Sequence, residues 1–253
     1  MDPIILHEDS DMLVVSKPAG MVVNKADSAK GNKTLQEWAE SYLNLHSFTP
    51  QKPTEAYMVD GYSKYDEFIN RGGVVHRLDK ETSGIVLIAK TPEVFINLQN
   101  QFKEGSVSKT YTTLVHGTLE KTEAEIEAPI GRLPWNRMRF GVYPEGRAAK
   151  TLYKVVEVKE SDRSEQYSLV EVYPKTGRTH QIRVHFKYIG NPIFGDELYA
   201  GRKTGRTDRK TLPRHFLHAA KISLNHPSTG NKIEFESQLP VELENVLKTL
   251  KTV

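Results

Sequence analysis

The chain has 253 residues, of which 38% are hydrophobic, with a formal net charge of +3 and no cysteine. The lack of cysteine excludes disulfides and thiolate metal sites, and no apolar run reaches the roughly 18 residues that a membrane-spanning helix needs. The amino terminus lacks the basic segment of a secretory signal, so we expect a cytoplasmic protein. The mild positive charge indicates a polyanionic partner only if it is clustered.

The first third of the chain predicts a pair of strands, a helix and a loop. Apolar runs at residues 4–6 and 12–15 predict the strands, with a polar turn at residues 9–11 between them. Residues 34–37 form a capping box, Thr-Leu-Gln-Glu, which predicts the start of a helix. Residues 46–72 have little periodicity and contain prolines and glycine, which predicts a long surface loop or insertion.

A polar loop at residues 76–84 leads directly into an apolar, β-branched run at residues 85–90, which predicts a buried strand. Asp79 lies in this loop, so we expect a rigid strand to hold its carboxylate at the edge of the core. From the residues alone, this carboxylate fits a nucleophile, a general base, a metal ligand or a cap. Residues 91–105 then predict a helix that begins after Thr91 and ends at a glycine.

The second half of the chain predicts a mainly antiparallel sheet. Strands are expected at residues 109–115, 151–158 and 167–173, with a closing hairpin over residues 216–235 and a short amphipathic helix near the carboxyl end. The pattern lacks a linker or an internal repeat. The sequence therefore predicts an α+β fold, with a mixed but mainly antiparallel sheet flanked by helices, in one domain over residues 1–253.

Residues 177–190 predict the helix that bears on function most directly. Thr179 is its expected N-cap, and Gly190 is expected to end it. Arg183 falls in its early turns, next to the apolar side chains rather than opposite them. His180 and His185 are five residues apart, which is not the i, i+4 spacing that places two metal ligands on one helix face. The sequence therefore predicts no metal site.

Basic residues cluster in two segments. Residues 131–150 carry five basic residues against one acid, interleaved with aromatic residues, and residues 201–215 carry six against one in an expected flexible loop. The first pattern is typical of a hairpin that contacts nucleic acid, although a solvent-exposed hairpin fits the same composition. Two such clusters favour a phosphate-bearing partner. The bases of the first cluster are Arg132, Arg137, Arg139, Arg147 and Lys150, with Trp135, Phe140 and Tyr143 among them.

Several short blocks, taken together, resemble one family. His76-Arg77-Leu78-Asp79, followed by Thr82-Ser83-Gly84, resembles the central motif of the RluA-type pseudouridine synthases. The resemblance implies a pseudouridine synthase fold and an isomerase that converts uridine in RNA to pseudouridine without a cofactor. It covers the catalytic domain, without the N-terminal RNA-binding domain that many relatives carry. Further blocks match in the same order: Lys17–Gly20, Lys109–Tyr111, Gly177–His185, Gly195-Asp196 and Leu217–Ala219.

The resemblance implies roles for three catalytic residues. Asp79 matches the family's catalytic aspartate, and Arg183 matches the arginine that pairs with it, although a structural ion pair is the alternative for both. Tyr111 matches the active-site tyrosine. We expect its ring to stack on the flipped uracil rather than its hydroxyl to remove the C5 proton, because a free phenol with a pKa near 10 is a poor base at neutral pH. Attack by Asp79 on ribose C1′ and attack on the uracil ring both remain open.

The resemblance also implies an RNA-binding surface. We expect Arg77 to fill the space of the flipped base or to bind phosphate, and Leu217 to form an apolar wall beneath the base. His76, Lys17 and Arg178 are further candidates, although a histidine in a tight loop more often makes local hydrogen bonds. The expected partner is a ribosomal or transfer RNA stem-loop, bound by a monomer. A catalytically silent RNA-binding or ribosome-assembly factor on the same scaffold is the alternative function.

Overall fold

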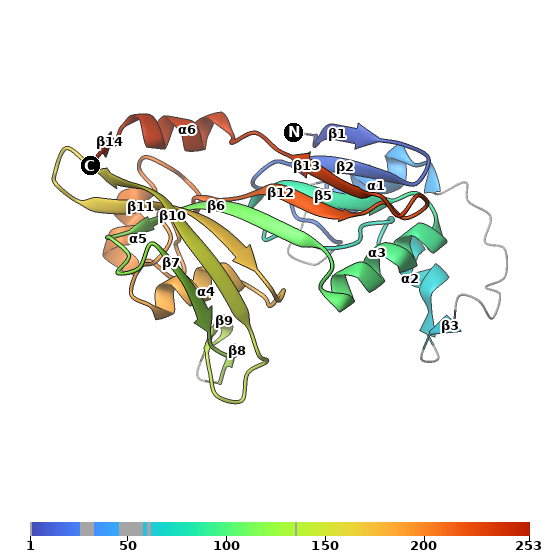
Figure 1. Cartoon of the computed structure of the whole chain (residues 1–253), viewed down its shortest axis with the longest axis horizontal. Helices are drawn as coiled ribbons and strands as arrows, with labels where there is room; N and C mark the ends of the chain where they lie inside the picture. The colour runs from blue at the N-terminus through green and yellow to red at the C-terminus, as the bar shows by residue number, and fades with distance from the viewer. Residues whose placement is uncertain (1, 26–32, 46–57, 60–61, 135) are drawn as a thin grey trace. The chain divides into compact units, whose positions relative to one another are not determined.

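The computed structural model describes residues 2–25, 33–45, 58–59, 62–134 and 136–253 (Figure 1). The chain divides into two compact units. Unit 1 comprises residues 1–107 and 221–237, and unit 2 comprises residues 108–220 and 238–253. Each unit combines helices with antiparallel strands, which confirms the predicted α+β class. The single domain over residues 1–253 stays a prediction. No helix in the described part of the chain is long and apolar enough to cross a membrane.

The sheet of unit 1 contains the strands predicted near the amino terminus. Strand β1 (Ile4–Glu8) pairs with β2 (Met12–Lys17), which pairs with β5 (Ser83–Ala89), and both ladders are antiparallel. All seven residues of β5 are buried, as its uninterrupted apolar run predicted. The carboxyl-terminal half of β12 (Leu217–Asn225) forms the expected hairpin with β13 (Lys232–Glu236).

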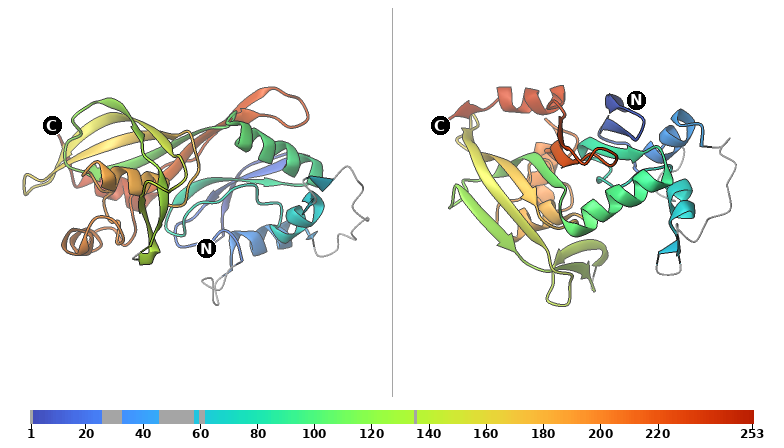
Figure 2. Two further views of the ribbon diagram at one scale, coloured as in Figure 1. Left: turned by 90° about the horizontal axis from the view of Figure 1, so that it is seen from below. Right: turned by 45° about the vertical axis from the view of Figure 1, so that its right-hand side comes forward.

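Two helices of unit 1 begin at the predicted residues, and one of them also ends at the predicted residue. The capping box of Thr34 and Glu37 is present at the start of α1 (Leu35–Tyr42). Helix α3 (Pro92–Glu104) begins after Thr91, whose hydroxyl accepts a hydrogen bond from the backbone of Val94, and ends at Gly105, which has a φ of 75°. Helix α3 packs against β5 and α2 (Lys64–Asn70) (Figure 2). Its buried Phe95 and Leu98 join the core of unit 1.

The predicted surface loop at residues 46–72 is wrong for its second part. Residues 46–57 and 60–61 lie outside the described residues. Residues 58–59 and 62–63 form a short antiparallel pair, β3 (Met58–Val59) with β4 (Tyr62–Ser63), and α2 follows directly. Ser63 caps α2 through the backbone N–H of Asp66, and Tyr65 and Phe68 bury one face of the helix. A helix of seven residues is too short to show a recognisable helical period.

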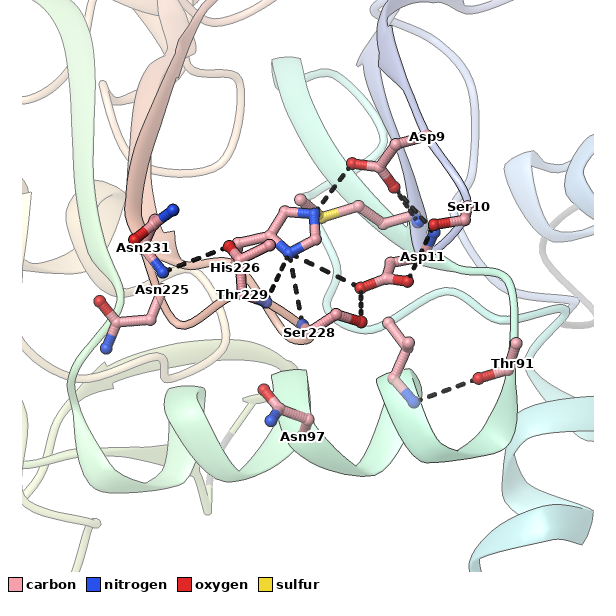
Figure 3. Close-up of polar contacts among 12 residues, drawn as sticks. Asp9, Ser10, Asp11, Thr91, Asn97, Asn225, His226, Ser228, Thr229 and Asn231 are labelled. Atoms are coloured by element: carbon pink, nitrogen blue, oxygen red, sulfur yellow. Dashed lines mark hydrogen bonds and ion pairs between the residues drawn. The ribbon is translucent and has the colours of Figure 1, made fainter.

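A polar cluster in unit 1 joins the β1–β2 turn to the β12–β13 turn (Figure 3). The imidazole of His226 lies 3.1 Å from the Asp9 carboxylate and 3.6 Å from that of Asp11. Its Nδ1 accepts backbone N–H groups of Ser228 and Thr229 at 3.3 Å. The hydroxyl of Ser228 donates to Asp11. The two turns, more than 200 residues apart in the chain, are therefore held together by hydrogen bonds to two carboxylates.

This cluster predicts an acid-sensitive contribution to stability. Burial alone raises the pKa of Asp9, but hydrogen bonds from His7, from two backbone N–H groups and from His226 outweigh burial and lower the pKa well below its usual range. A depressed carboxyl pKa stabilises the fold fully above the unfolded value of about 4, and this stabilisation is lost as the pH falls below it. We therefore expect Asp9→Asn to lower the free energy of unfolding at pH 7 and to flatten its decline between about pH 4 and pH 2. Urea unfolding across this range checks the prediction, and an acid dependence as steep as that of the wild type would contradict it.

The sheet of unit 2 is built from the central strands of the chain. Strand β11 (Gln166–Pro174) pairs antiparallel with β6 (Ser108–His116) on one side and with β10 (Lys150–Glu160) on the other. Strand β10 also pairs with β7 (Glu123–Glu127) and, near its end, with β14 (Lys251–Thr252). The three predicted strands of this unit are thus confirmed.

Three helices accompany this sheet, and two of them correct the predictions. Helix α4 (Gln181–Tyr188) begins after His180, which has a φ of 56°, so the predicted N-cap at Thr179 is wrong. Residues 201–215 are not simply a loop, because α5 (Arg202–Asp208) forms within them. Helix α6 (Val241–Lys248) confirms the amphipathic helix near the end. The core of this unit includes Ile182 and Phe186 of α4 together with apolar residues of β6, β11 and α6.

The first basic cluster forms the predicted hairpin. Strand β8 (Ile130–Leu133) pairs antiparallel with β9 (Asn136–Val142), and β9 contacts α4 (Figure 1). Trp135 lies outside the described residues. Arg132 and Arg139 are exposed on this hairpin. A small apolar cluster anchors the hairpin to α4 and the segment after it; its members are Ile130, Ala149, Val184 and Tyr199, with Phe140, Val142 and Leu198 packed against them.

Candidate active site

Asp79 lies in a tight turn just before β5. The backbone N–H of Thr82 donates to the carbonyl of Asp79 at 3.1 Å, which closes the turn. On its other side, His76 accepts the backbone N–H of Leu87 at 3.1 Å, and its ring lies 4.7 Å from that of Phe102. His76 therefore makes the local hydrogen bond considered for it from sequence. Asp79 as a whole residue is partly exposed, on a loop that is fixed at both ends.

Lys17 stabilises the turn of Asp79 through hydrogen bonds to backbone carbonyls. Its side chain is fully buried, and its ammonium donates to the carbonyls of Pro18 and Met21 at 2.9 Å and to that of Lys80 at 3.2 Å. The backbone N–H of Gly20 also donates to the carbonyl of Lys80, at 2.8 Å. The blocks 17–20 and 76–84, which are distant in sequence, thus form one structure. Lys17 has a structural role that the sequence did not predict, and its burial leaves no surface for contact with RNA.

The three hydrogen bonds of the Lys17 ammonium predict a large effect of this side chain on stability. In Lys17→Met, three carbonyls lose a charged donor, and we expect the free energy of unfolding to fall by about 3 kcal/mol. Chemical denaturation followed by circular dichroism measures this loss. The exposed Lys103 provides the matched control, since Lys103→Met should change stability by no more than about 0.5 kcal/mol. Equal stabilities of the two variants would show that the hydrogen bonds of Lys17 are dispensable.

Arg183 is held by a carboxylate of its own unit. The guanidinium is 5% exposed and binds Asp196 with two parallel hydrogen bonds, Nε to Oδ2 at 2.7 Å and Nη2 to Oδ1 at 3.0 Å. The guanidinium also lies 5.1 Å from the centre of the Tyr199 ring. Bidentate pairing fixes both the position and the plane of a guanidinium. A guanidinium has five N–H donors, so two bonds to Asp196 are compatible with a second anionic partner.

Asp196 is a partner of Arg183 to which the sequence reasoning assigned no role. Its carboxylate is fully buried and also accepts the backbone N–H groups of Leu198 at 3.0 Å and Tyr199 at 3.1 Å. The preceding Gly195 has a φ of 75°, and a Cβ there would lie 2.2 Å from the carbonyl oxygen of Arg214, so only glycine fits. The Gly195-Asp196 pair had appeared among the matched blocks, and this was the one signal in the sequence.

The loop that carries Asp196 is anchored by a second buried carboxylate. Asp208, the last residue of α5, accepts the backbone N–H of Gly195 at 3.0 Å and lies 2.9 Å from Nε2 of His116. Asp208 is 5% exposed. The second basic segment, residues 201–215, was expected to be a flexible loop. Part of it is instead helix α5, whose last residue supports the loop that carries Asp196.

The other predicted site residues of unit 2 are Tyr111 on β6, Arg178 in the loop before α4 and Leu217 at the start of β12. Tyr111 is partly exposed on β6 and packs against the core of the unit. Leu217 is 4% exposed in that core. Nε of Arg178 donates to the carbonyl of Ala148 at 3.0 Å. Burial, together with the charge of Arg147, lowers the pKa of Arg178.

The predicted site residues are divided between the two units. Asp79, Arg77, His76 and Lys17 belong to unit 1. Tyr111, Arg178, Arg183 and Leu217 belong to unit 2. The expected pairing of Asp79 with Arg183 joins residues of different units and stays a prediction. Arg77, directly beside Leu78 of the buried core, is exposed, as a residue that binds phosphate must be.

Comparisons with known proteins agree with these motifs. Residues 11–188 match the family model described as RNA pseudouridylate synthase. The chain is 37% identical over 251 residues to the uncharacterized RNA pseudouridine synthase YlyB of Bacillus subtilis, covering 99% of this chain and 74% of that protein. It is 36% identical over 258 residues to the ribosomal large subunit pseudouridine synthase D of Nitrosomonas europaea, covering 98% of this chain and 65% of that protein.

The fold is also similar to a solved one. The human RNA pseudouridylate synthase domain containing 1 matches 100% of this chain and 89% of its own with a TM-score of 0.71, at 24% sequence identity. At that identity the likeness concerns the fold alone. The sequence matches concern nearly the whole chain and include the blocks around Asp79 and Arg183. By its sequence and its fold, the chain belongs to the RluA-type family of RNA pseudouridine synthases, which are isomerases that act on RNA.

Proposed function

We propose that this chain converts specific uridines in structured RNA to pseudouridine, with Asp79 as the catalytic carboxylate. The observation that carries the proposal is the turn of Asp79, which Lys17, Gly20 and His76 hold in place while the residue stays partly exposed. A group that must meet a reacting atom needs this kind of preorganised support. Family membership supplies the reaction class.

The reaction is an internal rearrangement of one nucleotide. The bond from ribose C1′ to N1 of uracil breaks, the uracil turns, and a bond forms between C5 and C1′. The proton on C5 leaves and N1 takes up a proton, so the product is an isomer of the uridine. No electrons or groups are exchanged with a second substrate, so the chemistry requires no cofactor. Asp79 acts on the nucleotide either at C1′ or on the ring.

Arg183 and Tyr111 complete the proposed site. Arg183 serves as the ion-pair partner of Asp79, and its two bonds to Asp196 support this role because they set the plane of its guanidinium beforehand. Tyr111 stacks on the extruded uracil, which its partial exposure on β6 permits. Leu217, which is 4% exposed, is the residue proposed for the apolar wall beneath the base. Extrusion of the base costs a few kcal/mol, which binding of the surrounding RNA must supply.

Positive charge on unit 2 supports RNA binding there. Burial, and to a lesser extent the charge of Lys175, lowers the pKa of Lys109; burial, and to a lesser extent the charge of Arg147, lowers the pKa of Arg178. Like charges gathered in this manner attract a polyanion, and phosphates relieve their repulsion. We propose that these residues, the exposed arginines of the β8–β9 hairpin and Arg77 of unit 1 contact the RNA backbone.

The substrate proposed is a stem-loop of ribosomal RNA, with transfer RNA as the second choice. The name of the relative from Nitrosomonas europaea concerns the large ribosomal subunit, and this supports the order. We further propose that the protein acts as a monomer in the cytoplasm.

Tritium release from RNA labelled at uridine C5 tests the proposed function. Transcripts of ribosomal and transfer RNA that carry 5-tritiated uridine are incubated with the purified chain, and label in the solvent reports loss of the C5 proton. We expect release that approaches one tritium per modified site. RNA that binds without any release would instead favour a silent RNA-binding factor on this scaffold.

A further inference from the structure

Tyr199 touches both the guanidinium of Arg183 and the basic β8–β9 hairpin. Its ring centre lies 5.1 Å from the Arg183 guanidinium carbon. Its hydroxyl accepts the backbone N–H of Phe140, in β9, at 3.3 Å and lies 2.9 Å from Nδ1 of His180. Because a hydroxyl accepts one bond while donating its own proton, this one atom bridges the hairpin and the residue that precedes α4.

Two residues of one short turn, Asp196 and Tyr199, both contact the Arg183 guanidinium. Asp196 binds the Nε edge of the guanidinium, and Tyr199, three residues later, covers its face. The same Asp196 carboxylate accepts the backbone N–H of Tyr199 at 3.1 Å, so edge and face contacts are fixed relative to each other. Asp196 and Tyr199 are 0% and 6% exposed. A displacement of Tyr199 therefore reaches Arg183 directly.

The hairpin is packed against this turn rather than merely close to it. The ring of Phe140 meets that of His180 edge to face, with centres 5.7 Å apart, and Tyr199 shares its apolar cluster with Ile130 and Val184. The guanidinium of Arg132 lies 5.2 Å from the centre of the Phe140 ring. A contiguous set of contacts thus runs from an exposed arginine of the hairpin to Arg183.

We propose that Tyr199 is a positioning residue through which RNA held by the β8–β9 hairpin fixes the orientation of Arg183. RNA phosphates bound by the hairpin arginines hold β9 in place, β9 holds the Tyr199 hydroxyl, and the ring holds the guanidinium face. This inference rests on the proposed roles of Arg183 and of the hairpin. It assigns a function to a buried tyrosine that was not among the predicted site residues.

Two substitutions separate the hydroxyl of Tyr199 from its ring. Tyr199→Phe keeps the ring over Arg183 but loses the bond to the hairpin. We expect the KM for RNA to rise about fivefold because the hairpin is held less firmly, and kcat to fall about threefold because bound RNA no longer fixes the guanidinium. Tyr199→Leu also loses the ring, and we expect kcat to fall at least about tenfold in addition. Both constants are measured by tritium release, below the Tm of each variant.

Tyr167→Phe is the matched control. Tyr167 is also buried in unit 2, and its hydroxyl is also hydrogen bonded, to Glu165 at 2.9 Å, but it does not belong to the hairpin cluster. We expect its KM and kcat to equal those of the wild type. A purely structural role of Tyr199 would lower the Tm of its variants and leave KM and kcat unchanged, and that result would overturn the proposal.

Binding measurements keep this test separate from that of the proposed function. If the wild-type chain releases no tritium, the proposed function fails, yet the Kd for RNA still reports on the hairpin. Tyr199→Phe should raise this Kd about fivefold and should also speed hydrogen exchange of the Phe140 amide, because that N–H loses its acceptor. An unchanged Kd with unchanged exchange at Phe140 would overturn the coupling.

Discussion

Replacing Asp79 with asparagine should reduce tritium release by at least about a thousandfold without unfolding the protein. Asparagine keeps the shape of the side chain but cannot supply the negative charge that the proposed mechanism requires. The turn itself is held by Lys17, Gly20 and His76 through contacts with neighbouring backbone groups. The measurement is the kcat of the variant, with its thermal unfolding followed in parallel.

Asp66→Asn is the control for this prediction. Asp66 is an exposed acid in the first turn of α2, in the same unit, so the same chemical change there should leave kcat at the wild-type value. A fully active Asp79→Asn variant would remove Asp79 from the mechanism. A variant that loses activity only because its Tm has collapsed would show that Asp79 supports the fold instead.

Replacing Arg183 with lysine should lower kcat by about 100- to 1000-fold. A lysine keeps the charge, but a point charge cannot bind both oxygens of Asp196 and present an aligned donor to a second carboxylate at the same time. The Kd for RNA should change little, since Arg183 is 5% exposed and is not among the basic residues proposed to contact the RNA backbone. Tritium release and filter binding on the same preparations give the two values.

Arg214→Lys serves as the matched substitution. Arg214 is also 5% exposed in unit 2 and also pairs with a carboxylate, that of Glu242 at 2.9 Å. We expect this variant to keep its kcat, whatever it loses in stability. If Arg183→Lys were as active as Arg214→Lys, the fork geometry of Arg183 would be irrelevant to the reaction.

Local sequence patterns predicted the elements whose signals are local. The capping box at Thr34, the Thr91 cap with Pro92 and the glycine at residue 105 each define a helix end through neighbouring residues, and the structure confirms them. Helix α2 and helix α5 were missed because seven residues give too few turns for a period to show. The N-cap of α4 was misplaced because His180 adopts a left-handed conformation that propensity does not anticipate.

The candidate site was predictable only in part for the same reason. The resemblance indicated Asp79 and Arg183, and its matched blocks contained Lys17 and Asp196, but it did not show that these two are buried partners. Lys17 and Asp196 act through contacts that only the folded chain creates, with Lys80 and Arg183 respectively. No sequence pattern indicated Tyr199, because its proposed role depends on three groups that surround it only in the folded chain. These are the Arg183 guanidinium, the Phe140 backbone N–H and the His180 imidazole. Residue type and spacing do not encode such tertiary partners.

A crystal structure of the chain bound to an RNA stem-loop substrate tests the central claim most directly. We predict one extruded uridine stacked on the ring of Tyr111, with its ribose in contact with the Asp79 carboxylate and the Arg183 guanidinium within about 4 Å of that carboxylate. A uridine that stays stacked in the RNA, or an Asp79 and an Arg183 that contact different parts of the substrate, would contradict the account.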